Sequence, residues 1–385
     1  ARDARRAPLE ERSDCAWSGP RGRPQKRLHR NWAGPRQFDE PQPPARRHQT
    51  STAVPAEDGE PVALTWKELR AKKGIKGGDW RPYLSAHTDS HRLQKRLSHA
   101  RSIEDVSQEV LQSSLPLSEW APLSLATAWH RLARASSQTR GPRSVREEDA
   151  IERLAGALTE DVVSEFGPKE ISGVMYAWAL LNFKNTPLLQ LVYRRILDDA
   201  DRYDPQGIAN IFYALSHLKI PASSEIVSEV LEALCNVAVQ RLPEFGTQEI
   251  AMTVHAMGRL EFMHKELLSA VCRDLTIRVD HLSPHEVASV LNGLRWLKFR
   301  NFRLLEAICD TVPPKLSYFE ARHIANIAYA MGKFKVQNEE FTEALTRHVA
   351  VRYKEFYHQD PRRNALPGVM KSLKVLRAAQ DESLQ

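Results

Sequence analysis

The sequence IANIAYAMGKF occupies Ile324 to Phe334, and a close copy, IANIFYALSHL, occupies Ile208 to Leu218. The two stretches share Ile, Ala, Asn, Ile, Tyr and Ala in the same order. In each, apolar residues follow the first Ile by four, seven and ten positions. Steps of four, three and three keep one face of a helix with 3.6 residues per turn apolar. Each stretch therefore predicts an amphipathic α-helix rather than a strand.

Further windows with this spacing occur along the chain, and the first residue of each window is called its anchor. The anchors are Ile171, Ile208, Ile250, Val287, Ile324 and Leu366. They are separated by 37, 42, 37, 37 and 42 residues. A period in the range of about 20 to 50 residues is typical of solenoid proteins. The sixth residue after each anchor is small, which lets a neighbouring helix approach closely: Ala177, Ala214, Ala256, Gly293, Ala330 and Ser372.

A second amphipathic run follows several windows, so each repeat is expected to be a helix-turn-helix hairpin. These runs lie at 188–200, 225–242, 265–279 and 339–356. Pro168, Pro205 and Pro284 stand three residues before their anchors, where Pro suits the first turn of a helix.

The runs at 123–135 and 147–158 read as a degenerate earlier hairpin, and an atypical terminal repeat suits an end cap. The fold class predicted is therefore all-α, an α-solenoid of period 37–42 with a disordered basic N-terminal arm. The predicted domains follow the chain: a disordered Pro- and Arg-rich arm (1–60), a linker with short helices (61–115), a degenerate capping repeat (116–167) and six hairpin repeats, the last incomplete (168–385).

Positive charge is concentrated at the start of the chain. The formal net charge is +7, and residues 1–50 hold twelve Lys or Arg against six Asp or Glu. This stretch is rich in Pro and poor in aliphatic residues, so it cannot build a core of its own. Its densest run, RGRPQKRLHRNW, suits contact with phosphates, although a solvated tail fits the composition equally well. The candidate RNA-binding residues of the arm are Arg21, Arg23, Lys26, Arg27 and Arg30.

Patterns typical of enzymes and membrane proteins are weak in this sequence. We find no HExxH, GxSxG, kinase or phosphate-loop signature, so an enzyme is not expected. His281 and His285 are four residues apart, but no third ligand is near in sequence, and neither a metal nor another cofactor is expected. The four cysteines form no CxxC pair, and Cys272 and Cys309 are expected to be small buried apolar residues. No apolar run approaches the roughly 18 residues of a membrane span.

Polar and aromatic residues recur between the apolar positions of the first helices. RNA-reading repeat arrays present the same helix position once per repeat to an extended strand. We predict that the fifth position after each anchor faces away from the apolar stripe and that the eleventh, mostly basic, meets phosphate. The alternatives are packing of Tyr between repeats and capping of the helix dipole by Lys. The candidate RNA-binding residues of the repeats are Tyr176, Asn210, Tyr213, His255, Arg259, Asn292, Lys298, Asn326, Tyr329, Lys333, Lys335 and Lys371.

The IANIAYAMGKF type of segment, recurring about every 37 residues, resembles the heptatricopeptide repeats and the helical repeats of FAST-kinase-like organellar proteins that carry RAP domains. The resemblance covers about 165–385, and the sequence shows no RAP domain. It implies an α-solenoid, a mitochondrial or plastid location and work on organellar RNA. An opening Ala in place of Met is compatible with a removed organellar presequence.

The function expected from the sequence is therefore non-catalytic binding of organellar RNA. A subunit associated with the mitochondrial ribosome and holding ribosomal RNA is the specific form expected, with neighbouring proteins of a large assembly as further partners. Mitochondrial location is preferred over plastid. The alternative is a protein-binding scaffold subunit of an organellar complex, whose concave face would grip a helix or a peptide.

Overall fold

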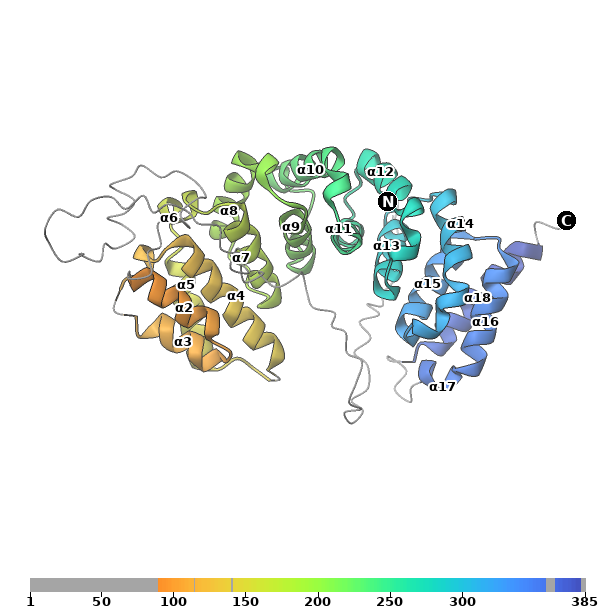
Figure 1. Ribbon diagram of the computed structural model, residues 1–385, viewed down its shortest axis with the longest axis horizontal. Coiled ribbons are helices and arrows are strands. Elements are labelled where there is room, and N and C mark those ends of the chain that lie inside the picture. The colour runs from red at the N-terminus through yellow and green to blue at the C-terminus, as the bar shows by residue number, and fades with distance from the viewer. Residues whose placement is uncertain (1–88, 114, 140, 358–363, 382–385) are drawn as a thin grey trace, which may run out of the picture. The chain divides into compact units, whose positions relative to one another are not determined.

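The computed structural model describes residues 89–113, 115–139, 141–357 and 364–381, and these residues form an all-α solenoid without a strand among them (Figure 1). They fall into two compact units. The N-terminal unit contains the described residues up to Leu275 together with Trp296–Phe299, and the C-terminal unit contains Thr276–Arg295 and the described residues from Arg300 onward. The predicted arm, residues 1–60, lies outside the described residues.

Helical hairpins follow one another along the N-terminal unit. First helices alternate with second helices, and short 3₁₀ turns close several hairpins. The helices are α2 (Asp89–His99), α3 (Ile103–Leu111), α4 (Pro122–Gln138), α5 (Val145–Gly156), α6 (Glu160–Ser164), α7 (Pro168–Leu180), α8 (Thr186–Asp198), α9 (Pro205–His217), α10 (Glu225–Gln240), α11 (Thr247–Leu260) and α12 (Lys265–Ile277), the last two residues of which belong to the C-terminal unit.

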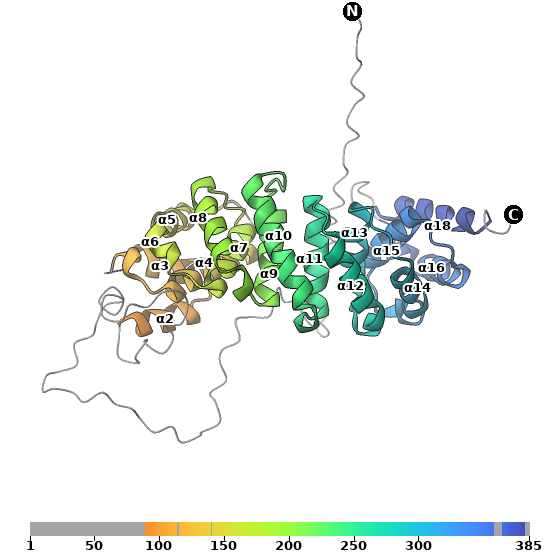
Figure 2. The same cartoon turned by 90° about the horizontal axis from the view of Figure 1, so that it is seen from above.

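The first helices of the N-terminal unit pack side by side. Helix α7 packs between α4 and α9, and α9 packs between α7 and α11. The second helices α8 and α10 pack on each other and form a separate layer, as the two views of Figures 1 and 2 show. Trp129 of α4 and Trp178 of α7 meet edge to face with ring centroids 5.9 Å apart. The hairpin of α4 and α5, predicted as a degenerate repeat, is itself covered by α2 and α3.

The C-terminal unit continues the same alternation. Its helices are α13 (Pro284–Trp296), whose last residue belongs to the N-terminal unit, α14 (Phe302–Thr311), α15 (Ala321–Phe334), α16 (Glu339–Val351), α17 (Tyr353–Phe356) and α18 (Leu366–Asp381). Helix α18 packs on both α15 and α16. The rings of His285 and His323 lie 5.9 Å apart, which places α13 beside α15.

Burial follows the predicted apolar stripe in five of the six windows. Ile171, Ile208, Ile250, Val287 and Ile324 are each at most 2% exposed. The residues four, seven and ten positions later are also buried, apart from the half-buried Leu260. The six small residues at the sixth position are all buried. The repeat pattern read from the sequence is therefore the core of the solenoid.

In the last window the predicted stripe is right for its second half and wrong for its first half. Leu366 is half-buried and Met370 is 43% exposed, whereas Val369, Leu373 and Leu376 are buried. Positions 369 and 370 lie on adjacent flanks of one helix, so the periodicity fits either choice. Packing of α18 against α15 and α16 selects Val369.

The first helices end in a recurrent left-handed residue. Asn182, Lys219, Glu261, Lys298 and Lys335 have φ between 46° and 56°, and each is the eleventh residue after its anchor. The next amide bonds back to the carbonyl five residues earlier in the Schellman manner, as for Phe183 to Trp178 and Val336 to Met331. A tight reversal therefore leads from the first helix of these repeats toward the second.

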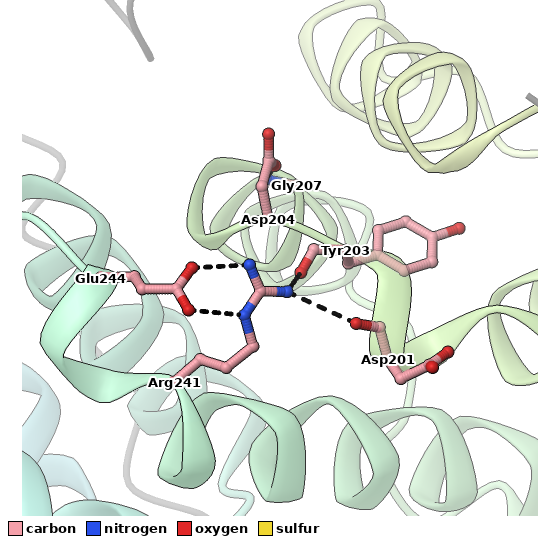
Figure 3. Close-up of polar contacts among 6 residues, drawn as sticks. All are labelled: Asp201, Tyr203, Asp204, Gly207, Arg241 and Glu244. Carbon is pink, nitrogen blue, oxygen red and sulfur yellow. Dashed lines mark hydrogen bonds and ion pairs between the residues drawn. The ribbon is translucent and has the colours of Figure 1, made fainter. Parts of the chain in front are cut away.

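An arginine that follows the second helix of a repeat connects it to the start of the first helix. Nη1 of Arg241, just after α10, donates to the carbonyl oxygen of Tyr203 at 2.8 Å, and its Nε and Nη2 pair with both carboxylate oxygens of Glu244 (Figure 3). Asp204, the next residue after Tyr203, caps α9 by accepting from the Gly207 amide at 2.8 Å. In the C-terminal unit Arg352 binds the Phe319 carbonyl oxygen at 2.9 Å and pairs with Glu355. The arginine thus satisfies a carbonyl oxygen just before the first helix of its own repeat.

The cysteines of two second helices are buried. Cys272 and Cys309 are free thiols, as predicted, and burial raises the pKa of each thiol to about 12. No helix in the described part of the chain combines the length and the apolar character needed to cross a bilayer.

Candidate nucleic-acid interface

Ring contacts and one hydrogen bond link three consecutive first helices of the N-terminal unit. The ring centroids of Tyr176 on α7 and Tyr213 on α9 are 5.2 Å apart. Tyr213 stacks on His217 of the same helix at 4.0 Å. Nε2 of His217 lies 3.1 Å from Nη1 of Arg259 on α11. Burial, with the nearby charge of Arg259, lowers the pKa of His217 to about 4, so the neutral imidazole accepts a hydrogen bond from the guanidinium.

Three candidates are shielded: Asn210, and the fifth-position residues Tyr176 and Asn292, for which this is contrary to the expectation that the fifth position faces away from the apolar stripe. Tyr176 is 8% exposed, Asn210 7% and Asn292 8%. Burial also raises the pKa of Tyr176 to about 12. Neighbouring first helices pack so closely that a side chain on the flank of one helix reaches the next helix. In this arrangement these three side chains pack in the protein and offer little surface to a ligand.

The remaining candidates of the N-terminal unit are more accessible. Tyr213 and His255 are half-buried, and Arg259 is exposed. His255 meets Trp296, which is part of the same unit, edge to face with ring centroids 5.1 Å apart. The aromatic residues at the fifth position in this unit thus all contact other rings.

In the C-terminal unit the aromatic residue at the fifth position, Tyr329, lies close to two cations. Tyr329 on α15 is 43% exposed. Cζ of Arg295, on α13, lies 4.8 Å from the centre of its ring, and Nζ of Lys333, one turn later on α15, lies 5.6 Å away. Asn326 stands three residues before Tyr329 and is half-buried, and Lys371 on α18 is exposed. The cluster of Arg295, Tyr329 and Lys333 is called the Tyr329 cluster below.

Charge separates the first helices of this unit from the second helices. Helix α15 carries Arg322 and Lys333 and no Asp or Glu. Helix α18 carries three basic residues against one acidic residue, whereas α14 and α16 carry more acidic than basic residues. Glu286 of α13 is held by the Ser283 amide at 2.7 Å as part of a helix cap. The Tyr329 cluster therefore lies on the basic layer of the C-terminal unit.

The residues at the eleventh position after the anchors have a conformational role in the structure. Lys298 and Lys335 are exposed, and both occupy the left-handed position that ends a first helix. A residue with positive φ at that position is what a Schellman ending requires, so the recurrence of this column reflects the chain reversal. Contact of these lysines with phosphate stays a prediction. Arg21, Arg23, Lys26, Arg27 and Arg30 lie outside the described residues.

A second surface of the C-terminal unit is apolar. Ile277 is 85% exposed, Val351 is 79% exposed, and Pro314 is also exposed. The three residues are each 27 positions after their anchors, at the end of a second helix or just beyond it. Tyr318, which ends the 3₁₀ turn Pro313–Tyr318 after α14, is 79% exposed. Sequence analysis missed this row and Arg295, although an apolar residue at a fixed position outside the stripe is a signal that could have revealed the row.

Metal ligands do not gather in the part of the chain that the structure describes, since no group of three or more His, Cys, Asp or Glu side chains there could hold an ion. His285 instead lies beside His323 of α15. The described residues thus show an aromatic and basic surface and an apolar row as their two candidate sites.

Fold and surface together define a helical-repeat protein with an aromatic and basic face on first helices of its C-terminal unit. Residues 227–372 match the model of a family described as RNA-editing substrate-binding complex 6 protein. The match begins in α10, ends in α18 and includes the whole Tyr329 cluster. It is a different family from the heptatricopeptide and FAST-kinase-like proteins, although the coarser expectation of similarity to an RNA-associated helical family is supported. No curated protein matches the chain.

Proposed function

We propose that this chain is a non-catalytic RNA-binding subunit of a mitochondrial ribonucleoprotein assembly, with the plastid as the alternative compartment. The observation that carries the proposal is the Tyr329 cluster, where an exposed ring lies beside two cations on a basic layer. Aromatic rings beside basic side chains suit binding of single-stranded nucleic acid. The family match over the same residues supports this choice.

The assembly proposed is one that holds an RNA substrate together with protein subunits. The description of the matched family favours this kind of assembly over a ribosome-associated subunit that holds ribosomal RNA. Neither an enzymatic activity nor a cofactor is part of the proposal.

Salt dependence of RNA binding tests the proposal. Fluorescence anisotropy of the full chain with a labelled unstructured RNA should show affinity that falls linearly with salt on a log–log scale. The double variant Lys333→Ala, Lys371→Ala should reduce the slope by about 1.4, since one phosphate contact on a single strand accounts for about 0.7. Lys354→Ala, an exposed lysine of α17, is the matched control and should keep the parent slope. Absence of RNA binding by the parent protein would refute the proposal.

A second candidate function, a protein-binding scaffold, is favoured by the apolar row of Ile277, Pro314 and Val351. Exposed apolar residues that recur at one repeat position form a strip that suits a protein partner. A photo-crosslinking amino acid placed at Tyr318 in cells should become linked to protein, whereas one placed at Lys333 should become linked to RNA. Linkage of both positions to protein alone would favour the scaffold over RNA binding.

A further inference from the structure

We infer that Tyr329 is a stacking platform for one unpaired base, so that the RNA held by the C-terminal unit is single-stranded where it crosses α15. This inference rests on the proposed RNA-binding function and names the form of RNA that its site takes. It depends on how Tyr329 differs from its counterparts in the other repeats.

The aromatic counterparts of Tyr329 in the N-terminal unit contact other rings. Tyr176 packs on Tyr213, and Tyr213 stacks on His217. His255 packs on Trp296. The contacts that the structure gives for the Tyr329 ring are with Arg295 and Lys333, both cations, and 43% of its surface stays exposed. Tyr329 is therefore accessible to an aromatic ligand in a way that the buried Tyr176 is not.

The two cations favour binding of a negatively charged strand at this ring. A guanidinium 4.8 Å from the ring centre attracts the π-face and restricts the rotation of the tyrosine side chain. Lys333 and Arg295 both lie within 6 Å of the ring centre, close enough to meet phosphates of a strand whose base stacks on the ring. A ring already restricted in rotation loses less conformational entropy on binding.

The chemistry of stacking excludes a paired base at this position. A base inside an A-form duplex has both faces covered by its neighbours and presents only its edges. Stacking on a protein aromatic ring needs a base that has left the duplex, and it tolerates different bases because every base has a π-face. A single strand with no strict sequence at this nucleotide is the ligand class that fits.

The test compares variants of the full chain on two probes, a labelled 15-nucleotide oligouridylate and an RNA duplex of equal length. Tyr329→Ala should weaken binding of the oligouridylate by about 5- to 150-fold, from the known range for one stacked base. Tyr329→Phe should stay within about threefold of the parent, because phenylalanine keeps the ring. Tyr318→Ala, which removes an exposed tyrosine of the same unit outside the cluster, should leave the affinity unchanged. The salt slope should be the same for Tyr329→Ala and the parent, because no charge is removed.

Folding is checked by thermal unfolding of each variant. If Tyr329→Ala fails to fold, ultraviolet crosslinking of the parent protein to the oligouridylate decides the question, and the adduct is expected on Tyr329. An adduct on other residues of the C-terminal unit would overturn the inference.

The inference and the proposed function fail in different ways. Unchanged affinity of a folded Tyr329→Ala, with salt-dependent RNA binding retained, would overturn stacking and leave RNA binding in place. Displacement of the oligouridylate by an equal charge concentration of polyglutamate would show that the cluster binds any anionic chain, which also overturns stacking. No binding of either RNA probe by the parent protein would refute the proposed function itself.

Discussion

His323 is a buried histidine on α15 without a hydrogen-bond partner on either ring nitrogen. It is 7% exposed, and its ring packs against that of His285 at 5.9 Å. Burial lowers the pKa of His323 to about 4, with the positive charge of Arg322 acting in the same direction and Glu320 opposing it. A histidine that stays neutral in the folded chain must gain its proton on unfolding below its ordinary pKa of about 6.5.

Stability should therefore fall as the pH drops from about 6.5 toward 4, because the unfolded state binds more protons over that range. For His323 the loss is of the order of 2 kcal/mol at pH 4.5. His323→Leu should remove this part of the pH dependence and keep or increase stability at pH 7.5, since it also removes two buried polar atoms without partners. Urea unfolding at pH 7.5, 5.5 and 4.5 measures both effects.

The control for this substitution is His281→Leu, at an exposed histidine in the 3₁₀ turn before α13. Its pH profile should follow that of the parent protein. An equally steep acid loss in His323→Leu would show that His323 is not a source of the pH dependence.

At the scale of helices, close packing of first helices depends on small residues. Ala214 of α9 is fully buried in a helix that packs against both α7 and α11. A Cβ added to Gly332 of α15 would lie 3.4 Å from the backbone oxygen of Ser372 on α18. Ser372 is the predicted small residue of its repeat, so the contact predicted from residue size is present between these two helices.

Ala214→Leu should destabilise the protein by about 1–3 kcal/mol, because three added carbons must displace packed neighbours. Ala378→Leu makes the same change on the exposed side of α18 and should alter stability by less than about 0.5 kcal/mol. Thermal or urea unfolding of both variants gives the comparison. Equal stability of Ala214→Leu and the parent would mean that the helices can move apart at no cost.

At the scale of the whole molecule, each repeat packs mainly on its neighbours. Helix α7 contacts α4 and α9, and α15 contacts α18, within their respective units. In such an array, stability is approximately the sum of repeat and nearest-neighbour contributions. A substitution that destabilises one repeat is therefore expected to affect that repeat and its neighbours, but not distant repeats.

Trp178→Ala tests this expectation. Trp178 is fully buried and contacts Trp129 and Phe183, so its truncation should cost about 3–5 kcal/mol in the N-terminal unit. Hydrogen exchange measured by mass spectrometry should accelerate in α4, α7 and α9 and stay unchanged in α15, α16 and α18. Faster exchange throughout both units would show that the chain unfolds as one cooperative block.

The amino-acid sequence by itself determined the repeat, the two helices of each hairpin and the buried stripe of nearly every first helix. These features depend on apolar periodicity, on Pro at helix starts and on residue size, which act within one helix or between copies of the same unit. The degenerate hairpin of α4 and α5 followed from the same signals, since the runs at 123–135 and 147–158 are amphipathic.

Only the tertiary structure decided which of the repeated polar residues a ligand can reach. Tyr176 and Tyr329 hold the same repeat position, yet one is 8% exposed and the other 43%. Exposure depends on what the adjacent helix presents: Tyr213 stands beside Tyr176, whereas Arg295 stands over Tyr329. The choice of Val369 over Met370 in α18 has the same origin. Periodicity marks a face of a helix, but the neighbour that packs against it decides whether that face remains open.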